Sequence, residues 1–98
     1  MNILMLERVG QYAENKDTAR DIRIKELAPA IEKKEKIILD FTGVETATQS
    51  FIHALISDLL KKHGNQTLDY VIFKSCNDSV KQFINIVVDY MQDAIGNQ

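Results

Sequence analysis

The chain has 98 residues, 45% of them hydrophobic, and we expect a single globular domain over 1–98 because this length supports one core and not two. The charged residues make up 27% of the chain, give a formal net charge of -2 and alternate in sign, which argues against general nucleic-acid binding. The apolar start, Met1–Leu6, is too short for a signal peptide, and no later run could span a membrane, so we expect a cytoplasmic protein. A single cysteine, Cys76, excludes an internal disulfide and a structural zinc site, and we expect no metal and no cofactor.

The first third of the chain predicts a strand and then a helix. Asn2–Val9 alternates in polarity, as a strand does. The apolar spacing of 18–34 predicts a helix with Asp17 or Thr18 as its N-cap. Pro29 lies inside this helix and cannot donate a backbone hydrogen bond. We therefore expect a kink or a break one residue before it.

The middle of the chain predicts a central strand followed by an amphipathic helix. Ile37–Phe41 is nearly continuous in apolar character, which is typical of a strand buried on both faces. Thr46–Gln49 matches a capping box, in which the first hydroxyl caps the helix and the glutamine reaches back. Gly64 supplies the end of the helix. The inward stripe consists of Phe51, Ile52, Leu55, Ile56, Leu59 and Leu60, and the outward side of His53, Ser57, Asp58, Lys61 and Lys62.

A third strand and a last helix complete the pattern. Leu68–Phe73 predicts the strand, and Asn77 or Asp78 can cap a helix that ends at Gly96. The inward positions of this helix are Val80, Phe83, Ile84, Val87, Val88, Met91 and Ile95. Because strands alternate with helices, we predict an α/β fold with a mostly parallel or mixed sheet and right-handed crossovers.

Three polar segments should meet at the carboxyl edge of such a sheet, where helices begin. They are Thr18 with Arg20, Thr46–Ser50, and Ser75–Ser79. Free backbone N–H groups at helix starts can hold an anion, so this edge is a candidate site for a phosphate or for an acidic group of a partner. The hydroxyls can equally be simple caps, and Arg20 can equally pair with a neighbouring aspartate. Asp40, at the end of the central strand, can be a base or a metal ligand, or can accept loop N–H groups.

The order and spacing of several short motifs resemble the STAS-like domains, relatives of sulfate transporter and anti-sigma factor antagonist domains. The matching residues are Thr18-Ala19-Arg20, Leu39-Asp40-Phe41, Gly43-Val44, Ser50-Phe51, Asn77 and Val80. The resemblance implies partner switching, in which a histidine-kinase-like ATPase binds the domain and phosphorylates a hydroxyl at the helix start. Ser50 matches that serine, and Thr48 stands where the family has an aspartate. The chain departs from the family at Phe51, where a glycine usually follows the serine, and at His53 and Ala54, where one branch has acidic residues.

We therefore expect a noncatalytic regulatory module that binds a protein partner. The expected phosphorylation sites are Ser50 and Thr48, and the expected partner or anion contacts are Thr18, Arg20, Thr46, Thr48, Ser50 and Asn77. The alternative is a small-ligand or nucleotide sensor that uses the same helix starts. The third alternative is a small enzyme in which Cys76 would act with His53 or His63, but the sequence shows no third group that would orient the histidine. An unpaired edge strand could also support a homodimer.

Overall fold

A three-stranded parallel sheet lies at the centre of the computed structural model, which describes residues 1–96 and the side chains of residues 1–93. Its strands are β1 (Asn2–Leu4), β3 (Ile37–Asp40) and β5 (Val71–Lys74), in the order β1-β3-β5. Both neighbouring pairs are parallel. Helices connect the strands, as parallel pairing requires. The predicted α/β architecture is confirmed.

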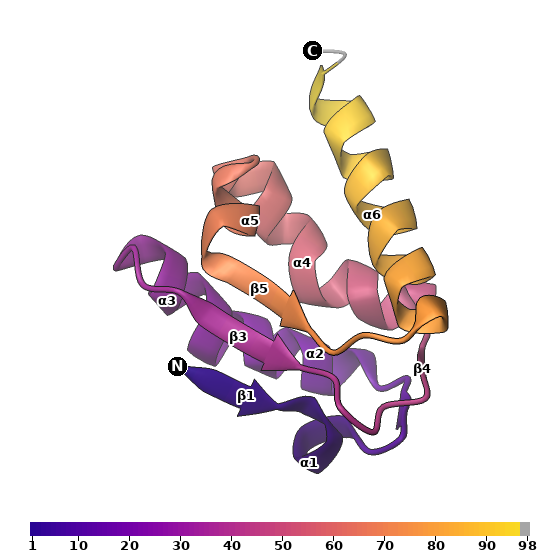
Figure 1. Ribbon diagram of the computed structural model, residues 1–98. Coiled ribbons are helices and arrows are strands. Elements are labelled where there is room, and N and C mark those ends of the chain that lie inside the picture. Colours follow the sequence, from indigo (N-terminus) through magenta and orange to yellow (C-terminus); the bar gives the residue numbers. More distant parts are fainter. Residues whose placement is uncertain (97–98) are drawn as a thin grey trace.

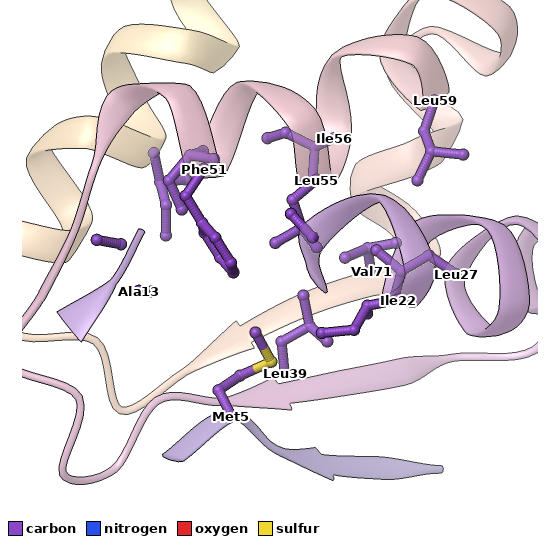
Figure 2. Close-up of a cluster of buried hydrophobic side chains, with 14 of the residues drawn as sticks. Met5, Ala13, Ile22, Leu27, Leu39, Phe51, Leu55, Ile56, Leu59 and Val71 are labelled. Atoms are coloured by element: carbon purple, nitrogen blue, oxygen red, sulfur yellow. The ribbon is translucent and has the colours of Figure 1, made fainter. Parts of the chain in front are cut away.

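The helices cover only one face of this sheet (Figure 1). Along β3, Ile37 and Leu39 are buried, whereas Ile38 and Asp40 are only half-buried. The prediction that this strand is buried on both faces is therefore wrong. The apolar core lies between the sheet and the helices. The side chain of Phe51 points from the helical layer toward the sheet, and the side chains of Met5 and Leu39 point toward the helices (Figure 2).

The first predicted strand is only partly a strand. β1 ends at Leu4, and Met5–Val9 forms the short helix α1. The strand stops early because β3 offers only a short partner, with register pairs from Asn2–Ile38 to Leu4–Asp40. The residues that follow are good helix formers, and α1 buries Met5 in the core.

The first long helix is interrupted, as Pro29 predicts. It consists of α2 (Lys16–Ile22), the π-helical segment η1 (Arg23–Leu27) and α3 (Ala28–Glu32). In η1 the Ala28 N–H donates to the carbonyl of Arg23, five residues back. The predicted N-cap is wrong, because Asn15 caps the helix and its Oδ1 accepts from the N–H groups of the second and third helical residues at 2.9 and 3.3 Å.

The second long helix, α4 (Gln49–His63), has the predicted inward stripe, and every one of its six apolar residues is buried. It ends at Gly64, whose φ of +61° suits glycine. Ser57 was predicted on the outward side but is 4% exposed, because α6 packs against α4 and covers it. Ser57 Oγ also lies 3.3 Å from His53 Nδ1.

The third predicted strand begins later than expected. Gln66–Tyr70 forms the short helix α5, so the strand β5 begins at Val71. The helical turn is fixed by Thr67, which is fully buried and donates its hydroxyl to the carbonyl of Leu59 at 2.8 Å. The Leu59 carbonyl therefore accepts this hydroxyl in addition to its bond within α4, and the bond ties α5 to the last turns of α4.

The last helix, α6 (Asp78–Gly96), is capped by Asn77, whose Oδ1 accepts from the N–H of Val80 at 2.9 Å. It packs against α4 and the short strand β4 (Thr46–Ala47), and its far end projects from the body of the molecule (Figure 1). Its buried residues are Val80, Ile84, Val87 and Met91, its half-buried ones are Phe83 and Val88, and Ile95 lies outside the described side chains. Within residues 1–96, no helix has both the length and the apolar character needed to cross a membrane.

Candidate functional site

A two-stranded ladder brings the starts of α2 and α4 together. β2 (Tyr12–Ala13) pairs in parallel with β4 just before each helix begins. The Thr48 N–H donates to the carbonyl of Ala13 at 3.0 Å. Thr46 therefore lies in β4 and does not cap α4, so the predicted capping box is wrong. The N-cap is Thr48, whose Oγ1 accepts from the Phe51 N–H at 3.1 Å.

The start of α6 joins the same edge. Asn77 donates from Nδ2 to the carbonyl of Glu45 at 2.8 Å while its oxygen caps α6. Thr46 Oγ1 and Ser79 Oγ lie 3.2 Å apart. The predicted convergence of three helix starts is confirmed. Asn77 and Thr46 use their polar atoms within this edge, where they hold the loops in place.

Ser50 lies in a groove between α2 and α4. The groove has a volume of about 400 Å³ and is lined by Lys16, Gln49, Ser50, His53 and Ala54. Ser50 is exposed and is the second residue of α4, so its hydroxyl lies at the helix end that carries partial positive charge. Thr48 is half-buried, and its hydroxyl is used as the cap. Ser50 is thus the more accessible of the two predicted phosphorylation sites.

A row of cationic side chains begins at this groove and follows α2 into η1. Lys16, Arg20 and Arg23 follow one another at spacings of four and three residues, which places them on one helix face. Arg23 donates from Nη1 to the carbonyl of Ala54 at 2.8 Å and lies 3.3 Å from Asp58 Oδ2, which fixes this row against α4.

The first two members of the row have no such anchor. Within residues 1–93, Lys16 and Arg20 form no ion pair and no side-chain hydrogen bond, so the pairing of Arg20 with Asp17 or Asp21 is not present. Arg20 is exposed and lies one turn beyond Lys16, outside the groove lining, and Thr18 is half-buried on the same helix. Lys16 is thus the cation that shares the groove with Ser50, and Arg20 is a second unpaired cation one helical turn from Lys16.

Asp40 has a structural role at the end of β3. Its Oδ1 accepts from the Thr42 hydroxyl at 2.6 Å and from the Thr42 N–H at 3.0 Å. These two bonds, the hydroxyl first, hold the pKa of Asp40 below its usual value. Asp40 is therefore a carboxylate that orders the turn after the central strand.

Cys76 lies two residues beyond β5. Its Sγ is 3.9 Å from the carbonyl of Lys74, and burial raises the pKa of its thiol. His53 contacts Ser57 on α4 instead. Neither arrangement prepares the thiolate that a cysteine nucleophile needs.

The groove residue Lys16 was missed as a candidate, and His53 was considered only as a base for Cys76 and as a departure from the family. Recognition of Asn15 as the cap would have placed Lys16 in the first turn of α2. His53 follows Ser50 by three residues, which puts both on one face of α4. Both signals are present in the sequence.

The chain is similar to a known family of domains. Residues 18–81, more than half of the chain, match a family described as a STAS-like domain of unknown function (DUF4325). No curated protein and no solved structure matches the chain. The matched segment contains α2 from Thr18 onward, the central strand β3, the helix α4 and the Asn77 cap, whereas the groove residue Lys16 precedes it. The chain belongs to this family of STAS-like domains.

Proposed function

We propose that this protein is a noncatalytic regulatory module that binds a protein partner through the Ser50 groove and acts by partner switching with an ATP-binding kinase. The observation that carries the proposal is the exposed Ser50 hydroxyl in a groove with Lys16, at the amino end of α4. A kinase can reach this hydroxyl without unfolding the helix. The STAS-like family membership supports a regulatory role of this kind.

Phosphorylation of Ser50 would change the groove strongly and locally. A phosphate adds about -1.5 to -2 charges at neutral pH. The start of α4 and the free cations Lys16 and Arg20 favour that charge, so the helix stays folded. A partner that reaches the groove with an acidic or apolar group would be repelled. The Thr48 hydroxyl is half-buried and already accepts from the Phe51 N–H, so Ser50 is the acceptor that a kinase would reach first.

The test uses a partner captured with the wild-type protein as bait and then purified. We expect Ser50→Asp to weaken its binding at least about tenfold, a change of roughly 1.4 kcal/mol. Arg20→Ala and Lys16→Ala should alter the affinity as well. Gln82→Glu, which adds a charge on the exposed side of α6, is the matched control and should bind normally. After incubation with the partner and ATP, mass spectrometry should place phosphate on Ser50 and none on Ser50→Ala.

Wild-type affinity in Ser50→Asp, Lys16→Ala and Arg20→Ala would show that this edge is not the interface. All variants must first give the circular dichroism spectrum of the wild type. If the variants change the affinity but no phosphate is transferred to Ser50, the groove is an interaction surface and the proposed kinase activity of the partner is wrong.

A nucleotide sensor is the second candidate, and the size of the groove favours it. Its volume of about 400 Å³ is within the range of small-molecule sites, and Lys16 supplies a cation. Calorimetry of the purified protein with ATP and ADP separates the two functions. Binding without any partner, lost in Lys16→Ala, would favour the sensor.

A further inference from the structure

The strand β5 has one unpaired edge. On its inner side it pairs with β3, and the Lys74 carbonyl accepts from the Phe41 N–H at 2.9 Å. Backbone groups of successive strand residues point to opposite sides, so the N–H and carbonyl of Phe73 face outward. Within residues 1–96, no strand pairs with this outer side.

A groove of about 680 Å³ follows this edge, between β5 and α6. Its apolar lining comes from Leu68 on α5, from Phe73 on β5, and from Ile84 and Val88 on α6. The groove exists because α6 packs against α4 and β4 and rises away from the sheet beyond β5 (Figure 1). It shares no lining residue with the Ser50 groove.

The charged side chains that line this groove are both positive. Lys74 and Lys81 line it, and among its described lining residues none is acidic. Neither lysine forms an ion pair within residues 1–93. Lys74 has Asp40 as its register neighbour on β3, whereas Lys81 is exposed on α6. Lys81 is therefore the cation that a bound segment would meet.

We propose that β5 accepts an extended acidic and apolar segment of a partner protein as an additional strand. Backbone hydrogen bonds to the outer edge of Phe73 would hold the segment, as in other cases of strand addition. Its apolar side chains, which recur at every second residue, would fill the groove toward Ile84 and Val88, and an acidic residue would approach Lys81. A second copy of this chain fits less well, because it would bring its own Lys74 and Lys81 to a groove that is already cationic.

The probe is a fluorescently labelled octapeptide of alternating valine and glutamate, followed by anisotropy. We expect saturable binding, weakened about tenfold or more in Lys81→Glu. Lys61→Glu, which changes an exposed lysine on α4 outside this groove, is the matched control. The same peptide with lysine in place of glutamate should bind much more weakly.

Two further measurements test strand addition itself. Amide hydrogen exchange of Phe73 should be fast in the free protein and about tenfold or more slower with the peptide. Peptides N-methylated on the valines or on the glutamates block opposite edges of the strand. One of the two should lose binding and the other should retain it.

The proposal is overturned if the valine-glutamate peptide does not bind at concentrations up to about 1 mM. It is also overturned if binding leaves Phe73 exchange unchanged, or if both N-methylated peptides bind like the parent. Sedimentation that shows a dimer whose formation protects Phe73 would replace the partner segment with a second copy.

Discussion

Replacement of Phe51 by alanine should remove one of the two fully buried phenylalanine rings of the core. Phe51 is fully buried, and its ring points from the first turn of α4 toward the sheet (Figure 2). Deletion of a buried phenylalanine ring costs about 3–5 kcal/mol, through lost apolar transfer energy and the cavity left behind. A domain of this size is stable by only about 5–15 kcal/mol. Phe51→Ala should therefore leave a protein that is folded marginally or not at all at 37 °C.

Urea denaturation followed by circular dichroism measures this loss. Each kcal/mol lowers the Tm of a domain of this size by roughly 4–8 °C, so thermal melting gives a second reading. Phe83→Ala is the matched control, because it deletes the same ring from a half-buried position on α6 and should cost less. An unchanged midpoint for Phe51→Ala, or an equal cost for Phe83→Ala, would refute the assignment of Phe51 to the core.

Three further predictions concern polar and backbone contacts. Thr67→Val should destabilise the protein by about 0.5–1.5 kcal/mol in urea titrations, because the hydrogen bond from the buried hydroxyl to the Leu59 carbonyl is lost; Thr67→Ser keeps the hydroxyl, and an equal loss in both variants would contradict this reason. The pKa of Asp40 is lower in the folded protein than in the unfolded chain, so the ionised carboxylate stabilises the fold at pH values above the unfolded pKa, and this stabilisation is lost as the pH falls through the folded pKa. Thr42→Val should raise the pKa of Asp40 in an NMR titration, and an unaltered titration would mean that the hydroxyl has no role. Gly43→Ala should cost about 1–3 kcal/mol in thermal melts, because the residue has a φ of +83° and its new Cβ would lie 2.8 Å from Leu6 Cδ2; a wild-type Tm would show that the turn relaxes freely.

The long periodic elements could be predicted from the sequence, and the short ones could not. The stripe of α4 extends over three turns, so its inward face is unambiguous. Met5–Val9 and Leu68–Tyr70 are too short for helical and strand periodicities to be told apart. Their structure is decided by β3, whose four residues leave no partner for longer neighbouring strands.

The position of the candidate site could be predicted from the sequence, but only some of its residues could. The alternation of strands and helices placed Ser50 and Arg20 near one edge of the sheet. The ladder of β2 and β4 could not be predicted, because strands of two residues have no periodicity. Pairing in that ladder places Thr46 in β4 and not at the N-cap of α4. The Asn15 cap places Lys16 in the first turn of α2, where it lines the groove.

The π-helical segment η1 makes the first long helix one residue longer than a regular helix with the same buried face. Ile22 and Leu27 are both buried, yet in an α-helix residues five apart differ in direction by about 140°. The wider turn between them lets both point into one core. Loss of a single residue from Arg23–Leu27 would therefore rotate α3 and its buried Ile31 relative to α2. A substitution at Ile24, which is 55% exposed, leaves that geometry unchanged. The length of this segment, more than its composition, is what the core requires.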